Sequence, residues 1–350
     1  MKDIPYIDSL NEIIDTQLKP FVKKIDENAY YPKEFHKKIG GLGFFSSSNL
    51  QNEFVRYREA LLIQETAKHC MTSAFTLWCH LAATSTIRLS NNPYLIKELL
   101  PLLESGEVLG GTALSNALKY YSGLEDIRLQ AKRVEGGYTI SGSLSNVSNL
   151  CNDHWFVIFA SVEKQQRILC ILPVNIKGLG LKQVVGLIGL NGSATFSCTF
   201  NNVFIPEQWV ITEDADNYIP RIRPILALYQ IPLGLGVSEA AIESIYQTYN
   251  KNKALNQHVR PQLAELETEL QLLKNRTIDF TQLQDLSEQT KNIMRTRLEM
   301  VYLTSKIVHN EMISSGGNAY FQTSNSYRRL RESYFLVNLT PTLKQLEMLQ

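Results

Sequence analysis

The stretch that decides the fold runs from Glu135 to Pro173 and reads EGGYTISGSLSNVSNLCNDHWFVIFASVEKQQRILCILP. After the glycine turn at its start, Tyr138–Ser141 alternates as a half-buried strand does. Trp155–Phe159 and Arg167–Leu172 are apolar runs of strand length, and Pro173 closes the second. The pattern predicts further strands at Leu181–Val185, Ala194–Asn201 and Val203–Ile205. Several short strands with polar turns indicate a small sandwich or barrel over residues 111–212.

Helical spacing replaces this pattern on both sides. Residues 1–110 show apolar positions three and four apart, and the region from Arg58 to Leu89 carries few charges, which is typical of buried helices. Residues 213–350 predict three long helices, which start behind Pro224, at Pro261 and near Asp285. The third has a narrow apolar seam typical of a bundle. A β module between two helical blocks is therefore expected, in an α+β chain that is mostly helical.

The composition is that of a globular chain with balanced charge. Of 350 residues, 35 are Lys or Arg and 34 are Asp or Glu, so the net charge is +1. This balance supplies no overall attraction to nucleic acid or to an anionic membrane, and we expect neither partner. The start of the chain lacks the apolar segment of a signal peptide, and we found no run near the ~18 apolar residues of a membrane span. We expect a cytoplasmic protein.

Five cysteines are present, and no two of them form a CxxC pair. An odd number without metal-ligand spacing argues against both a zinc site and a disulfide framework. We therefore expect buried thiols in a reducing compartment, and no metal.

Six stretches, taken in order along the chain, resemble the acyl-CoA dehydrogenase family. They are Tyr31–Phe35 running to Gly41–Phe45; Leu99–Glu107 with Ala113–Ser115; Gly136–Gly142 with Val147–Asn149; Gly186–Ser193 leading to Asn202–Pro206; Arg223–Pro224 with Pro232–Gly236; and Gly316–Tyr320 with Arg331–Glu332. The resemblance covers nearly the whole chain. It implies a helical N-terminal domain (1–110), a middle β domain (111–212) and a C-terminal four-helix bundle domain (213–350). It also implies bound FAD, shared with a neighbouring subunit, in a homodimer or homotetramer.

The resemblance also implies roles for particular residues. Leu114 and Ser115 match the segment that lines the flavin ring, and Ser148 matches the hydroxyl at flavin N5, with Asn146 nearby where the family often has an aromatic residue. A hydroxyl suits N5 because it can both donate and accept. Two more matches are made farther from the ring: Gly316 and Gly317 correspond to the glycines against the adenosine, and Arg223 to an arginine near CoA.

The sequence departs from the family where catalysis needs a base. Acyl thioester dehydrogenation removes an α-proton with a carboxylate while the flavin accepts the β-hydride. In many relatives that glutamate stands where Thr340 stands here, in the substrate site. In others it lies on the helix that starts near Arg223–Pro224, but residues 219–236 contain no Asp or Glu. The sequence therefore leaves the catalytic residue unknown. Glu207, Glu213 and Asp214 are carboxylates near the junction of the β and helical regions. The pyrophosphate motif is also degraded, with Lys251 or Lys253 as possible replacements for its arginine.

Three hypotheses follow. The first is a FAD-dependent oxidoreductase that dehydrogenates an acyl thioester of CoA or a carrier protein and passes electrons to an acceptor. The second is a flavin-dependent monooxygenase on the same fold, served by a flavin reductase and in no need of the thioester base. The third is a partner subunit that has lost catalysis.

Overall fold

The computed structural model describes residues 7–48, 50–163, 166–251 and 260–349. Its first part is helical. The elements are α1 (Ile7–Ile13), η1 (Ile14–Leu18), η2 (Lys19–Phe21), α2 (Val22–Glu27), α3 (Lys33–Gly41), α4 (Asn52–His69), α5 (Met71–Arg88), η3 (Leu95–Leu99) and α6 (Leu100–Glu104). Every residue of α5 except Arg88 is buried, which explains why this stretch has so few charges.

The middle part is one eight-stranded sheet, in which seven strands follow the order β6-β7-β3-β2-β4-β5-β8 and β1 pairs with β4. The strands are β1 (Gly110–Thr112), β2 (Leu129–Val134), β3 (Gly137–Val147), β4 (Trp155–Val162), β5 (Gln166–Pro173), β6 (Leu179–Gln183), β7 (Phe196–Pro206) and β8 (Val210–Thr212). The pairs β1–β4 and β2–β4 are parallel and the other pairs are antiparallel. A short helix, α7 (Ser115–Tyr120), interrupts the strands, and so do the 3-10 turns η4 (Asn191–Ser193) and η5 (Glu207–Trp209).

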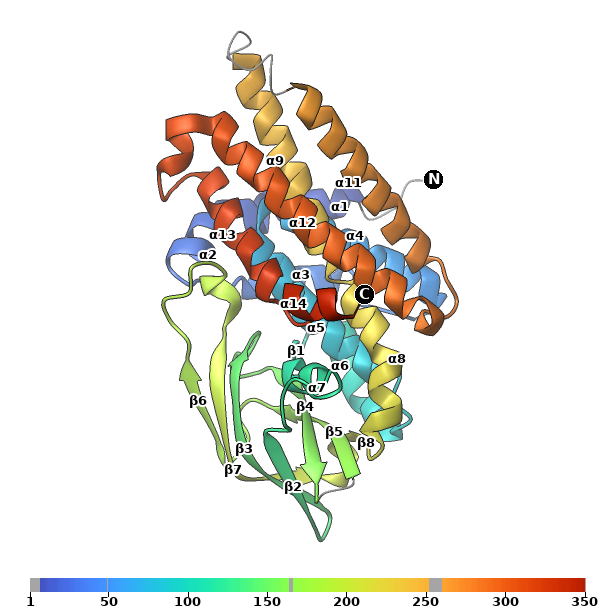
Figure 1. The fold of residues 1–350 in the computed structure, drawn as a ribbon. Helices are drawn as coiled ribbons and strands as arrows, with labels where there is room; N and C mark the ends of the chain where they lie inside the picture. The colour runs from blue at the N-terminus through green and yellow to red at the C-terminus, as the bar shows by residue number, and fades with distance from the viewer. Residues whose placement is uncertain (1–6, 49, 164–165, 252–259, 350) are drawn as a thin grey trace.

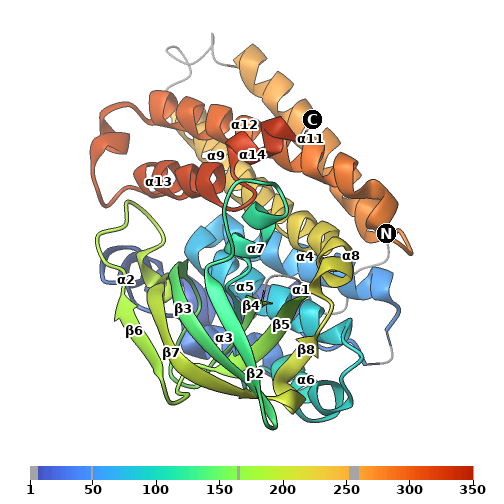
Figure 2. The same ribbon diagram turned by 60° about the horizontal axis from the view of Figure 1, so that its bottom comes forward.

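The last part is again helical. It contains α8 (Ala215–Leu228), α9 (Ile231–Lys251), α11 (Arg260–Thr281), η6 (Ser287–Gln289), α12 (Thr290–Ser315), η7 (Gly316–Tyr320), α13 (Asn325–Asn338) and α14 (Leu343–Met348). The strands gather at one end of the molecule, beneath the helices (Figure 1). In the turned view α7 lies between the sheet and the C-terminal helices (Figure 2). The expected architecture, a mostly helical α+β chain with a β module between two helical parts, is confirmed.

The two faces of β4 belong to different cores. Phe156 and Ile158 pack inside the β domain, whereas Val157 and Phe159 pack with the helices. Because neighbouring side chains on a strand point to opposite faces, a strand covered on both sides reads as an unbroken apolar run. This accounts for the run in the sequence, and it places the sheet firmly against α5.

Several predicted element boundaries are wrong. The helix expected from Ile225 is two helices, and it begins earlier, at Ala215, because the side chain of Asp214 accepts a hydrogen bond from the Asn217 amide at 3.2 Å and caps it. The two strands predicted within 194–205 form the single strand β7, in which Asn202 has a left-handed φ of 52°. The predicted strand at Leu181–Val185 starts earlier and ends at Gln183.

One stretch, Ala215–Asn250, is long and apolar enough to cross a membrane by composition alone, contrary to the sequence-based expectation. However, 83% of its most apolar window is buried inside the protein. This apolarity therefore serves packing between α8, α9 and their neighbours.

A cluster of buried histidines joins the N-terminal helices to the β domain. The Nδ1 of His36 donates to the Pro32 carbonyl oxygen at 2.7 Å, and its Nε2 lies 2.8 Å from the Thr76 hydroxyl. Burial lowers the pKa of His36 to about 4 and also lowers the pKa values of His80 and His154. All three rings are therefore neutral in the folded protein at pH 7.

We expect stability to fall as the pH drops below about 6.5, the pKa of an unfolded histidine, towards 4. In this window the unfolded state binds the extra protons, and each histidine contributes a slope of up to about 1.4 kcal/mol per pH unit. His36→Gln should weaken the dependence of the free energy of unfolding on pH by the equivalent of about one bound proton. Urea unfolding at several pH values measures it. A slope equal to that of the wild type would contradict this assignment.

Candidate active site

A cavity of about 390 Å³ opens between the sheet, α7 and the C-terminal helices. Its apolar wall includes Phe75 and Trp78 of α5, Leu118 of α7, Leu226 of α8, Phe335 of α13 and the following Leu339. Its polar lining includes Ser115, Ser145, Asn146, Ser148, Ser193, Thr195, Asn338 and Thr340. A mostly apolar pocket with a few convergent polar groups is the usual form of a small-molecule site.

Five residues selected from the sequence line this cavity together. They are Leu114, Ser115, Asn146, Ser148 and Thr340. The Ser115 and Thr340 hydroxyls lie 2.8 Å apart, although 225 positions separate them along the chain. The residue at the position of the family's base is therefore in contact with the position expected at the flavin edge.

A buried arginine and a glutamine hold Thr340 in place. The Nε2 of Gln230 donates to the Thr340 carbonyl oxygen at 2.9 Å, and the Gln230 Oε1 accepts from Nε of Arg297 at 3.0 Å. Arg297 also donates to the Leu336 carbonyl at the end of α13, at 2.8 Å. A cation is favourable there because the helix C-terminus carries partial negative charge.

Arg297 is only 1% exposed, and none of the described residues gives it a carboxylate partner. Burial lowers its pKa to about 9, so it is still protonated near pH 7. The sequence reading missed it. The available signal was a charged residue three positions after Met294 and four before Val301, on the apolar face of α12.

Ser148 takes part in a chain of hydroxyl groups. Its Oγ lies 2.7 Å from the Thr195 hydroxyl, which in turn lies 2.7 Å from the Ser193 hydroxyl. The next residue, Asn149, is buried with a left-handed φ of 64°, and its side chain accepts from the Tyr31 hydroxyl at 2.6 Å. Contacts from the loop between α2 and α3 and from the η4 turn thus fix the segment that carries Ser148.

No carboxylate lines the cavity within the described ranges, and its charged lining residues are Lys119 and Arg331. Glu213 pairs instead with Arg133 and accepts from the Tyr138 hydroxyl at 2.6 Å. Asp214 caps α8, and Glu207 starts η5. None of these three carboxylates reaches the cavity.

Arg223, Gly316 and Gly317 do not line it either. Arg223 is half-buried on α8; its Nε has no hydrogen-bond partner among the described residues, and burial lowers its pKa. Gly316 follows α12 with a φ of 56°, as a C-cap glycine does, and a Cβ added at either glycine would meet nothing within 4 Å. Their expected ligand roles stay predictions. The side chains of Lys251 and Lys253 lie outside the described part of the structure.

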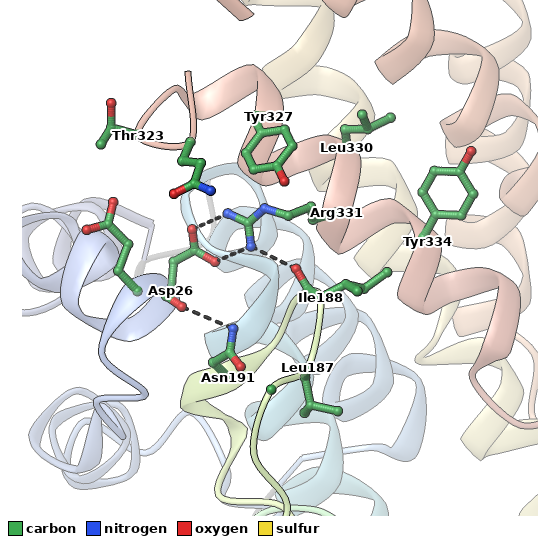
Figure 3. A pocket seen from close by; sticks show the side chains of 12 residues that line it. Asp26, Leu187, Ile188, Asn191, Thr323, Tyr327, Leu330, Arg331 and Tyr334 are labelled. Carbon is green, nitrogen blue, oxygen red and sulfur yellow. Dashed lines mark hydrogen bonds and ion pairs between the residues drawn. The ribbon is translucent and has the colours of Figure 1, made fainter. Parts of the chain in front are cut away.

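A second cavity, of about 730 Å³, adjoins the first (Figure 3). The two share Leu187, Ile188, Arg331 and Tyr334 in their walls. The Nη1 of Arg331 donates to the Asp26 carboxylate at 2.8 Å and to the Ile188 carbonyl oxygen at 2.9 Å (Figure 3). This one side chain therefore joins α2, the loop after β6 and α13 at the partition between the cavities.

The acyl-CoA dehydrogenase N-terminal domain model matches residues 6–107. Benzylmalonyl-CoA dehydrogenase of Aromatoleum aromaticum is 21% identical, over 75% of this chain and 74% of that protein. The chain is thus similar to the acyl-CoA dehydrogenase family, over its N-terminal part by the domain model and over most of its length by this relative. It is an oxidoreductase of acyl-CoA dehydrogenase type, and members of this family are FAD-dependent.

Two solved structures show the same fold over the whole chain. Butyryl-CoA dehydrogenase from Megasphaera elsdenii has a TM-score of 0.88 at 17% identity, covering 100% of this chain and 98% of that one. A glutaryl-CoA dehydrogenase from Mycobacterium smegmatis in complex with FADH2 has a TM-score of 0.82 at 16% identity, covering 98% and 91%.

Replacing the buried glutamine tests the support of the cavity. Gln230→Met keeps the size of the side chain but leaves Nε of Arg297 and the Thr340 carbonyl unpaired, and should lower the free energy of unfolding by about 1–3 kcal/mol. The matched control is Gln271→Met, on the exposed face of α11, expected within about 0.5 kcal/mol of wild type. Urea denaturation of both compares them, and equal losses would show that the Gln230 contacts are not stabilising.

Proposed function

We propose that this chain is a FAD-dependent oxidoreductase that dehydrogenates an acyl thioester carried on CoA or a carrier protein. The observation that supports this proposal most directly is the cavity, in which Ser115, Ser148 and Thr340 lie opposite apolar side chains. The same proposal includes a homodimer or homotetramer, an electron acceptor and a cytoplasmic location.

The cavity fits the flavin ring on its polar side. An isoalloxazine needs hydrogen-bond partners along its pyrimidine edge and at N5, and hydroxyls can serve as both donors and acceptors. Leu114 and Ser115 would hold the edge, and Ser148 would face N5. When bound, FAD supplies the acceptor for the hydride that leaves the substrate β-carbon.

The apolar wall would bind the acyl group and exclude water. Phe75 packs edge-to-face against Phe335, with ring centroids 4.5 Å apart, and stacks on Trp78 at 5.6 Å. The Trp78 indole nitrogen donates to the Leu226 carbonyl at 3.1 Å, so its polar atom is already satisfied. This end of the cavity therefore suits an uncharged hydrocarbon group.

The chain supplies no carboxylate base for the α-proton among the residues that line the cavity. The paired hydroxyls of Ser115 and Thr340 cannot take up that proton at neutral pH. We therefore infer that turnover is slow, with the proton passing to a base brought by the partner. The missing carboxylate would stand at residue 340, where this chain has a threonine.

Installing that base tests the proposal. Thr340→Glu should speed bleaching of the bound flavin by acyl-CoA by about 10²-fold or more, because a positioned general base contributes that much. Thr340→Gln, with the same shape and no base, should not. The measurement is an anaerobic titration with a panel of thioesters, followed by flavin absorbance. If no thioester bleaches either the wild type or Thr340→Glu, dehydrogenation is excluded.

A second candidate is monooxygenation, favoured by the carboxylate-free cavity and by the polar Asn146 on its rim. It predicts that thioesters leave the flavin oxidised, whereas a separate flavin reductase reduces it and product forms only with oxygen. A third candidate, an inactive partner subunit, predicts a purified protein whose spectrum lacks the flavin bands.

A further inference from the structure

Two segments of the backbone carry much of the polar lining of the cavity. Thr112 ends β1 and Ser115 begins α7, whereas Ser148 follows β3, and all three residues line the cavity. In the sheet, β1 pairs with β4, and β3 pairs with β2 and β7. Sheet pairing therefore does not directly set the spacing between these two segments.

The side chain of Asn149 joins the two segments. Its Nδ2 donates to the carbonyl oxygen of Gly110, in β1, at 2.7 Å, and its Oδ1 accepts from the Tyr31 hydroxyl at 2.6 Å. Because the Gly110 carbonyl can only accept, the NH2 group of the amide must face it. The backbone amide of Asn149 donates to the Ser193 carbonyl at 2.9 Å, and its carbonyl accepts from Nδ1 of His154 at 2.8 Å. Asn149 is thus buried with both its side chain and its backbone paired.

Close packing on both faces of β1 leaves the strand little freedom. The Gly110 amide donates to Nδ1 of His80 at 2.9 Å, and a Cβ added to Gly110 would lie 2.7 Å from the Cβ of Ala83, so this face packs on α5. Successive residues of a strand point to opposite faces. A Cβ added to Gly111 would accordingly lie 2.9 Å from the Ser148 carbonyl oxygen. Both glycines permit a close approach that no larger residue would.

We propose that Asn149 is a positioning residue that sets the spacing between β1 and the segment that carries Ser148. Asn149 does not line the cavity itself, so it acts through its neighbours. The inference rests on the proposed function, in which Ser115 holds the edge of the flavin ring and Ser148 faces N5. A rigid ring cannot follow a change in the separation of its two partners, so the loss of a preorganised spacing weakens FAD binding.

Removing the side chain tests this role. Asn149→Gly tolerates the left-handed backbone but loses the link to Gly110, and it should raise the dissociation constant of FAD about tenfold, as the loss of one such contact does. The matched control is Asn92→Gly. The Nδ2 of Asn92 also donates to a backbone carbonyl, that of Val210 at 2.8 Å, and neither of these two residues lines the cavity. This control should lose stability and keep the wild-type dissociation constant.

A second pair of variants changes the same spacing from the other side. Gly111→Ala keeps the hydrogen bonds of Asn149 but forces β1 away from the Ser148 carbonyl, and it should also raise the dissociation constant about tenfold. The control is Gly180→Ala in β6, where the added Cβ would meet nothing closer than 3.7 Å and FAD binding should not change.

The measurement is flavin fluorescence on dilution of the FAD-loaded proteins, at a temperature at which circular dichroism shows each variant to be folded. A purely stabilising residue would leave the dissociation constant of the folded protein unchanged. A value within twofold of wild type in Asn149→Gly, or an equal increase in Asn92→Gly, overturns the inference. Gly111→Ala and its control decide in their place if Asn149→Gly does not fold.

The two proposals can fail separately. If the wild type holds FAD that no thioester bleaches, dehydrogenation fails and the dissociation constants still decide the role of Asn149. If the wild type takes up no FAD, the proposed function fails and amide hydrogen exchange decides that role. In Asn149→Gly, exchange in residues 110–115 and 145–150 should then rise about tenfold together, and in Asn92→Gly it should not. Unchanged exchange in Asn149→Gly would overturn the positioning role.

Discussion

The geometry of the cavity depends on how the chain leaves α13. Arg297 brings a positive charge into the interior, and no carboxylate in the described part of the chain balances it. Its guanidinium donates instead to the last turn of α13 and to Gln230. Such a group is costly to bury, and it is tolerated where its hydrogen bonds are satisfied. Through Gln230 the same contact fixes the backbone of Thr340, so the far end of the sequence becomes part of the wall opposite the sheet.

These contacts explain how the cavity keeps its shape although no carboxylate stands at position 340. Backbone contacts and apolar side chains give the cavity its shape. That shape does not depend on whether a glutamate or a threonine stands at position 340. Binding and proton removal are thus separable in this chain. The hydroxyls of Ser148, Thr195 and Ser193 belong to the binding part, since all three residues line the cavity.

Much of the fold could be predicted from the sequence, because β4 and β5 carry apolar runs that only a doubly covered strand needs, and α5 lacks charge for the same reason. The grouping of Ser115, Ser148 and Thr340 came from the resemblance, and the cavity brings these residues together. Gln230, Arg297 and Thr195 could not be predicted, since each is an ordinary polar residue whose importance arises from partners far away in the sequence. Pro224 was misread as a helix start because the cap at Asp214 lies ten residues earlier.

The ion pair between Arg331 and Asp26 has a consequence for how the molecule comes apart. It ties the N-terminal helices to the C-terminal ones at a point where a loop of the β domain is also held (Figure 3). Releasing α13 would therefore expose α2 and loosen the loop at Ile188 in a single event. Opening the partition between the two cavities would therefore cost the contacts of Arg331 with α2 and with the loop at Ile188 together.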